Sequence, residues 1–314
     1  MKISLVVLFL MGAMFLSRAE SKAPNNPTLA VSTNADEGNI WLMNPDGNNQ
    51  RALLLVNGQP LGLEWSPDGT RLAFHTESKK NIDVYVVNGD GMKLKRLTDD
   101  AAEDSWPNWH PGGGKLAFTS NRDGNFEIYT MNAAGQIIEN ITNDPADDIQ
   151  PAWSRDARKI AFSSKRGKTI GDLHLMDANG ENLQNLTNHR AKDSHPAWSP
   201  DNEKIAWITE RSGHAEIFVM GANGKNQIKI GCCRDPEWSP DGKELATTTF
   251  GGGVAKIIIQ DADGKGNRTE LPTIGNFNRA AAWFDPEFVT FFSVSPAGKQ
   301  ALTWGWLKQV GRSK

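Results

Sequence analysis

The sequence has little of what marks several common classes of protein. Its 314 residues include only two cysteines and two tyrosines, and after the N-terminal segment no apolar stretch approaches eighteen residues. We therefore expect neither a framework of several disulfides nor a membrane-spanning helix after that segment. The charge is nearly balanced, with 34 basic and 37 acidic residues. This balance argues against nucleic acid or an anionic membrane surface as the main partner.

The N-terminal segment has the pattern of a secretory signal. Lys2 is followed by a largely apolar run that ends at Phe15, and small residues stand at the positions that a signal peptidase reads. We predict a signal peptide over residues 1–19, a flexible lead over residues 20–28, and a periplasmic or secreted protein. Removing the two basic residues of the signal peptide leaves 32 basic against 37 acidic residues, a net charge of about −5.

The dominant feature is a tryptophan motif that occurs six times. The copies are LEWSPDGTRLAF, PNWHPGGGKLAF, PAWSRDARKIAF, PAWSPDNEKIAW, PEWSPDGKELAT and the degenerate AAWFDPEFVTFF. Steps of 44, 44, 45, 40 and 45 residues separate their tryptophans, which are Trp65, Trp109, Trp153, Trp198, Trp238 and Trp283. A repeat of this length is typical of β-propeller blades, which bury their faces against one another. We predict that each tryptophan is a structural wedge between blades.

A second landmark is a glycine that follows a short apolar strand in each repeat. The six are Gly47, Gly91, Gly135, Gly180, Gly224 and Gly264, and each of the first five tryptophans precedes the next of them by 26 or 27 residues. Asn-Gly or Asp-Gly between two apolar strands predicts a hairpin turn. Each unit is therefore predicted to hold four strands: at the tryptophan, at the LAF-like triplet, before the glycine, and at a pair such as Leu97-Thr98.

The phase of the repeat at its two ends predicts how the ring closes. The chain reaches its first hairpin glycine with no tryptophan motif before it, and no hairpin glycine follows the last tryptophan motif. We predict an all-β fold, a six-bladed β-propeller over residues 29–292 with the last blade closed by both termini. Leu29-Ala30 and residues 289–292 both align with the second strand of the repeat, so the closing blade has one strand more than the others. Residues 293–314 are predicted to form a C-terminal strand or cap.

The strings WSPDGTRLAF and IYTMNAAG and the closing Leu-Thr pair resemble the WD-like propeller repeat of the TolB family. The resemblance covers about residues 29–292 and implies a propeller that binds partner proteins in the periplasm. TolB proteins carry an α/β domain ahead of the propeller, whereas about nine residues separate the predicted signal peptide from the first repeat here. Related repeats form propellers in some peptidases and in a carbohydrate lyase, so an enzymatic alternative stays open.

The start of each innermost strand supplies the candidate ligand-binding residues. Three successive blades carry an aspartate five residues before the tryptophan: Asp104, Asp148 and Asp193. Two residues further on in four blades stand Trp106, Gln150, His195 and Asp235. We predict that these side chains form an acidic, partly aromatic rim of the channel, suited to a cation, a sugar or a basic peptide. The alternative is that each aspartate only accepts hydrogen bonds from a turn.

The histidines give little support for a metal centre. His110, His189 and His195 lack the paired spacing of metalloprotease motifs, and His110 replaces the serine of the WSPDG turn. A G-x-S-x-G nucleophile motif is also lacking. We predict no cofactor, no metal and no catalytic residue. A metal-dependent polysaccharide lyase of the oligogalacturonate type, using the same rim, is the alternative function.

The two cysteines are adjacent, at Cys232 and Cys233, where the repeat is shortened. Only 14 residues separate Gly224 from Trp238, against 18 in the four preceding links. Two interpretations stay open: two reduced thiols, or a strained vicinal disulfide that replaces the missing loop.

Together these features predict an exported, monomeric binding scaffold that is not an enzyme. Its partner is expected to be a protein or peptide, bound through the channel face and the loops around it. Nucleic acid and a membrane span are not expected.

Overall fold

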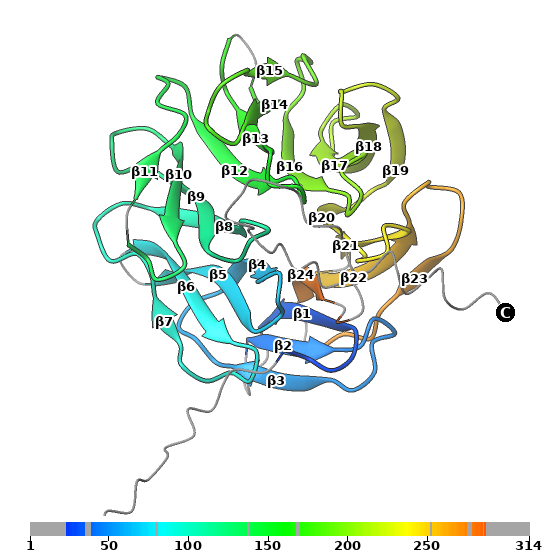
Figure 1. The fold of residues 1–314 in the computed structure, drawn as a ribbon. Helices are drawn as coiled ribbons and strands as arrows, with labels where there is room; N and C mark the ends of the chain where they lie inside the picture. Colours follow the sequence, from blue (N-terminus) through cyan, green and yellow to red (C-terminus); the bar gives the residue numbers. More distant parts are fainter. Residues whose placement is uncertain are drawn as a thin grey trace, which may run out of the picture.

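A computed structural model describes residues 23–34, 39–78, 81–136, 138–167, 170–251, 253–274, 278–284 and 286. The strands form six four-stranded antiparallel sheets, arranged as blades around a central axis (Figure 1). This is the six-bladed, all-β propeller that the repeat predicts. Within the described ranges, no helix has both the length and the apolar character needed to cross a membrane.

Five blades are built from strands that follow one another in the chain. From the axis outward they are β4 (Pro60–Trp65), β5 (Arg71–Ser78), β6 (Asn81–Asn88) and β7 (Lys95–Arg96); β8 (Asp104–Trp109), β9 (Lys115–Ser120), β10 (Glu127–Asn132) and β11 (Glu139–Asn140); β12 (Asp148–Trp153), β13 (Lys159–Ser164), β14 (Asp172–Asp177) and β15 (Gln184–Asn185); β16 (Asp193–Trp198), β17 (Lys204–Thr209), β18 (Glu216–Gly221) and β19 (Ile228–Gly231); and β20 (Arg234–Trp238), β21 (Glu244–Gly251), β22 (Val254–Asp261) and β23 (Arg268–Glu270). Each innermost strand ends at the repeated tryptophan.

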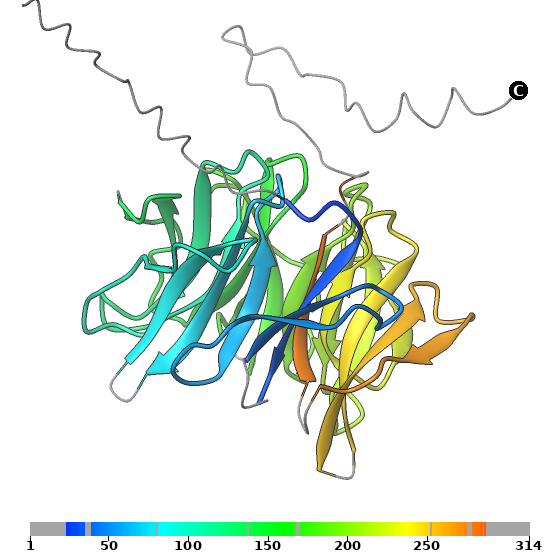
Figure 2. The same ribbon diagram turned by 90° about the horizontal axis from the view of Figure 1, so that it is seen from below.

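The remaining blade combines strands from opposite ends of the sequence. Its sheet order is β24 (Asn278–Phe284), β1 (Thr28–Thr33), β2 (Ile40–Met43) and β3 (Arg51–Leu54). β24 pairs antiparallel with β1, and the two lie side by side in Figures 1 and 2. Residues 1–22 and 287–314 lie outside the described residues, and with them the predicted signal peptide, the surplus strand at 289–292 and the C-terminal strand or cap.

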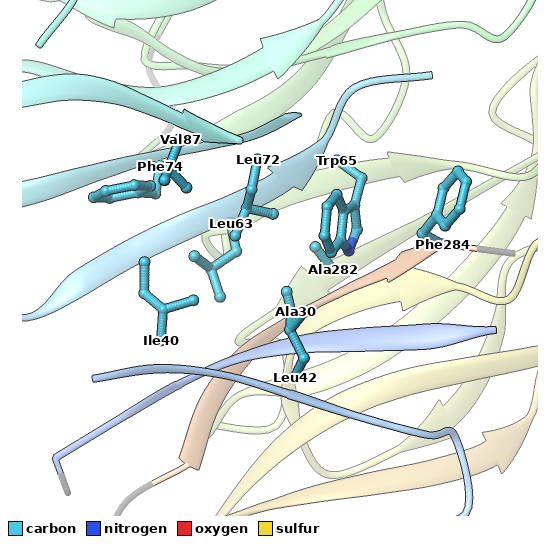
Figure 3. Packing of buried hydrophobic residues seen from close by; sticks show 10 residues of the cluster. All are labelled: Ala30, Ile40, Leu42, Leu63, Trp65, Leu72, Phe74, Val87, Ala282 and Phe284. Atoms are coloured by element: carbon cyan, nitrogen blue, oxygen red, sulfur yellow. The ribbon is translucent and has the colours of Figure 1, made fainter. Parts of the chain in front are cut away.

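The tryptophans hold the blades together. Each packs into a cluster shared by its own blade and the preceding one. Around Trp65, for example, Leu72 and Phe74 of the same blade meet Ala282 and Phe284 of β24 (Figure 3). The first five tryptophans are buried and Trp283 is partly buried. Truncating such a buried aromatic side chain typically costs about 3–5 kcal/mol, so these wedges are a major source of stability.

The hairpin glycines set how closely neighbouring blades approach. At Gly135 the backbone has a φ of 77°, which disfavours other residues. A Cβ there would also lie 2.7 Å from the carbonyl oxygen of Leu97 on the preceding blade. Gly180 and Gly224 show the same approach to carbonyl oxygens of their preceding blades. The glycine that the sequence predicts as a turn residue is therefore also an inter-blade contact.

The Leu-Thr pair ends the outer strand instead of lying within it. β7 stops at Arg96, and the side chain of Thr98 then accepts a hydrogen bond of 3.0 Å from the backbone N–H of Val84. Thr142 and Thr187 do the same in the next two blades. A side-chain oxygen thus replaces the next backbone partner of the ladder, so each of these outer strands stops just before the pair at which the sequence predicts it.

Candidate functional site

The innermost strands carry a bulge that aims one side chain at the axis. The third residue before the tryptophan has a positive φ in five blades: Gly62 (58°), Trp106 (52°), Gln150 (60°), His195 (55°) and Asp235 (53°). The pairing register shifts at the same place in each of these strands. A positive φ is unfavourable for residues other than glycine, and such strain concentrates at functional positions.

A cavity of about 120 Å³ lies on the axis between the innermost strands. Its lining includes all five bulge residues and, one level further along the strands, Glu64, Asn108, Ala152, Ala197 and Glu237. Arg155, from the turn after β12, completes the charged lining. Four predicted rim residues, Trp106, Gln150, His195 and Asp235, are therefore brought together as the sequence suggests.

The ring of Trp106 reaches a residue two blades further around the ring. Its ring centroid is 4.7 Å from that of His195, edge to face, although β12 stands between their two strands. The ring centroid of His75 also lies 4.9 Å from that of Trp106, and Nδ1 of His75 accepts a hydrogen bond from the backbone N–H of Trp106. A Cβ on Gly62 would come within 3.3 Å of the indole. The missing side chain of Gly62 thus leaves room for Trp106.

A network of hydrogen bonds orients His195. The Oε1 atom of Gln150 accepts from the backbone N–H of His195 at 3.1 Å, which fixes the orientation of the amide. The amide Nε2, which can only donate, lies 2.8 Å from Nε2 of His195. Nδ1 of His195 lies 3.2 Å from Oγ of Ser194. Asp235 is 3.9 Å from Nε2 of His195.

The three predicted rim aspartates do not line the cavity, which corrects the prediction. Their side chains are fully buried, and each receives an arginine that lies 18 residues later in the chain. The pairs are Asp104–Arg122 at 3.1 Å, Asp148–Arg166 at 2.6 Å and Asp193–Arg211 at 3.3 Å. We call these pairs the Asp–Arg clamps. The physical reason is that the aspartate precedes the bulge, so its side chain stays in the sheet beside the hairpin between the second and third strands.

Burial dominates the electrostatics of the first two clamps. Loss of water raises the pKa of Asp104 and Asp148, and the charges and hydrogen bonds of Arg122 and Arg166 only partly oppose this. The ion pairs therefore do not fully repay the cost of burying the carboxylates. They join the start of the innermost strand to a hairpin loop, which is a structural task.

The cysteine pair occupies the aspartate register in a blade without a clamp. Cys233 is buried at the position that Asp193 holds in the preceding blade, and Cys232 is exposed. Both thiols are free, so the vicinal disulfide does not form in this structure. Burial raises the pKa of the Cys233 thiol, and Nη2 of Arg268 lies 3.8 Å from its Sγ atom. Cys233 is thus a small buried residue in this strand.

Sequence reasoning missed the two glutamates of the cavity. Burial raises the pKa of Glu64 to about 7. Burial and the charge of Glu64 raise the pKa of Glu237 well above its usual range. In both cases the positive charge of Arg155 opposes the shift. The available signal was their position, one residue before a repeated tryptophan and two after a bulge residue, on the face that the bulge turns inward.

The other histidines have local structural partners. Nδ1 of His110 accepts from the backbone N–H of Gly112, so it replaces the serine of the turn as the sequence suggests. Nδ1 of His189 accepts from the backbone N–H of Ala191 in the same way. In the part of the chain that the structure describes, no three His, Cys, Asp or Glu side chains are grouped as metal ligands.

Comparison with solved structures places the fold among known propellers. TolB from Acinetobacter baumannii is 22% identical with a TM-score of 0.73, over 82% of this chain and 66% of that one. A putative TolB from Agrobacterium tumefaciens is 19% identical with a TM-score of 0.64, over 79% and 88%. A chain of a nidogen/laminin complex is 11% identical with a TM-score of 0.65, over 82% and 98%.

These similarities show the fold. The chain spans just under two thirds of the Acinetobacter baumannii TolB chain. A sequence search of curated proteins found no match. The family model described as the TolB beta propeller domain matches residues 57–142, 107–171 and 139–303, which together cover most of the chain. The chain therefore belongs to the TolB beta propeller domain family.

Proposed function

We propose that this protein is an exported, non-enzymatic scaffold that binds a protein or peptide at its axis. The observation that carries the proposal is the ring of bulges. Four non-glycine residues adopt a positive φ, and all four line the same cavity. Such backbone conformations cost of order 1–3 kcal/mol each. A fold that only needed stable blades gains nothing from this strain, whereas a binding site gains the inward direction of the four side chains.

The chemistry of the ring fits recognition of a polypeptide. Trp106 offers an aromatic face, and Gln150 and Asp235 offer polar groups beside it. Tryptophan is among the residues most enriched at the energetic centres of protein interfaces. A chain in a nidogen/laminin complex has a similar fold, which supports a role of this architecture in assemblies of proteins.

Export is supported by the N-terminal sequence pattern. If residues 1–19 are a signal peptide, the mature protein begins at Glu20. Intact mass and N-terminal sequencing of the protein recovered outside the cytoplasm test this. Light scattering of the same sample measures the molar mass and so tests whether the protein is a monomer. A full-length chain that stays in the cytoplasm would contradict export.

A photo-crosslinking amino acid at two positions tests the binding site. Position 106 lies at the axis, and position 183 carries the exposed Leu183 on the outer side of a blade. We expect a discrete crosslinked partner from position 106 in envelope extracts, and none from position 183. His195→Ala should weaken that crosslink in protein that retains its thermal midpoint. Equal crosslinking from both positions would remove the axis from the proposal.

A further inference from the structure

The charges that line the cavity do not balance. Glu64, Glu237 and Asp235 carry carboxyl groups, and Arg155 is the one lysine or arginine among the described lining residues. With all three carboxyl groups ionised, three carboxylates stand against one guanidinium. A cavity of this kind selects a cation over a neutral or anionic guest.

The glutamates lie where water solvates them poorly. Both line the cavity, on the strands β4 and β20 that flank β24, and each is only partly exposed. Each feels the guanidinium of Arg155, and the ionised form of Glu64 disfavours that of Glu237. The backbone N–H of Trp283 on β24 is a hydrogen-bond donor to Glu237. A second cation placed between the two carboxylates would relieve their repulsion.

The depth of the site selects the shape of the guest. The glutamates lie two residues beyond the bulge level, about 6.6 Å along strands that rise about 3.3 Å per residue. The indole of Trp106 lines the same cavity at the bulge level. A guest that enters from the bulge end and reaches the glutamates therefore places a stem beside the indole and its charge at the end of that stem. Lysine and arginine have this form, and their stems pack well on aromatic rings.

We propose that the cavity receives a lysine or arginine side chain of the partner, with its stem against Trp106 and its cationic head between Glu64 and Glu237. This rests on the proposed function, because it names the group that a polypeptide partner inserts. Binding requires the carboxylates to be ionised. Because the pKa of Glu64 is raised to about 7 and that of Glu237 is also raised, binding should strengthen as the pH rises through the titration of Glu64.

The test uses three tripeptides as probes: acetyl-Gly-Arg-Gly-amide, its lysine analogue and its norleucine analogue. Calorimetry at about pH 8 should show at least about tenfold tighter binding of the charged peptides than of the norleucine peptide, because the neutral stem lacks the ionic contact. At about pH 6 the preference should shrink severalfold.

Matched variants separate the site from general charge effects. Glu64→Gln with Glu237→Gln should abolish the preference for the charged peptides. The control is Glu139→Gln with Glu203→Gln, which removes the same charge from two exposed positions and should leave binding unchanged. Equal affinity for the norleucine peptide, no binding of any peptide, or Ca²⁺ binding that depends on the glutamates without arginine binding would each overturn the inference.

Failure of the inference can be told apart from failure of the proposed function. If the crosslink from position 106 persists in the Glu64→Gln, Glu237→Gln protein with unchanged yield, the scaffold function stands and the basic guest is wrong. If the crosslink is absent from the wild type while the arginine peptide still binds, the cavity has the stated chemistry but the partner does not use it.

Discussion

The two halves of the ring differ in how their innermost strands begin and in what they present to the axis. In the three blades from β8 to β19 an Asp–Arg clamp fixes the start of the strand, and the cavity receives Trp106, Gln150 and His195. In the other half the clamp aspartate is replaced by Pro60, Cys233 and Asn278. The carboxylates of the cavity, Glu64, Glu237 and Asp235, all come from this second half.

The difference shows that buried charged side chains have two different roles at neighbouring positions of one repeat. In the clamped half each carboxylate has a guanidinium within hydrogen-bonding distance and is removed from the cavity. In the unclamped half Glu64 and Glu237 have only the more remote charge of Arg155 against them. Paired charges fix the loops, and poorly paired charges are available to a guest.

The largest expected effect comes from breaking a clamp. Asp148→Ala leaves Arg166 without its main partner, and removing one member of a buried ion pair costs about 3–5 kcal/mol. Cys233→Ala at the same register should cost about 1 kcal/mol, because only a small buried side chain is lost. Urea unfolding of both variants measures the contrast. Equal losses would show that the two halves do not differ in this respect.

A double variant sharpens the same point. Asp148→Leu with Arg166→Met should recover most of the stability lost by Asp148→Ala, since a buried pair can often be replaced by apolar residues at little cost. If the double variant is as unstable as the single one, the Asp–Arg pair contributes a stability that well-packed apolar side chains cannot replace.

A smaller effect, of opposite sign, is expected in the unclamped half. The pKa of Glu64 is raised from 4.5 to about 7, so the folded state holds this proton more tightly than the unfolded state. Stability is therefore lost as the pH rises through this window. Glu64→Gln should stabilise the protein by about 3 kcal/mol near pH 8, at about 1.36 kcal/mol per pKa unit, with little effect near pH 4.

Thermal unfolding of Glu64→Gln across this pH range measures the effect. Glu203→Gln, on an exposed turn, is the control and should give the same melting temperature as the wild type at every pH. A stabilisation of Glu64→Gln that does not change with pH would contradict the role of the carboxylate charge.

The smallest effect concerns the one cation that the clamped half contributes to the cavity. Arg155→Gln removes the charge that holds down the pKa of Glu64 and Glu237, so both should move further up. Carbon-13 NMR of labelled glutamate side chains follows the titration directly. Arg158→Gln, three residues along and well exposed, should leave both titrations in place. Unchanged titration in Arg155→Gln would mean that the two halves do not interact across the axis.

Prediction from sequence succeeded where a feature depends on spacing along the chain. The recurrence of Trp65 and its equivalents predicts the blades, and the bulge residues Trp106 and His195 were recognised because they share one phase of the repeat. The prediction that Asp148 lines the channel was wrong, because its side chain forms an ion pair with Arg166, 18 residues further along the chain. The sequence does not identify Glu64 as a site residue, because a single glutamate before a tryptophan indicates no function. Its role depends on Glu237, which only the closed ring brings near it.

The sequence by itself determined the number of blades, their strand order and the residues that wedge them together, because local turns and a fixed period suffice for these. Only the tertiary structure decided which polar side chains face the axis. Closing the ring brings residues far apart in the chain, such as Glu64 and Glu237, into one poorly solvated cavity. Solvation and charge pairing in that cavity depend on all the innermost strands together, and no single repeat contains that information.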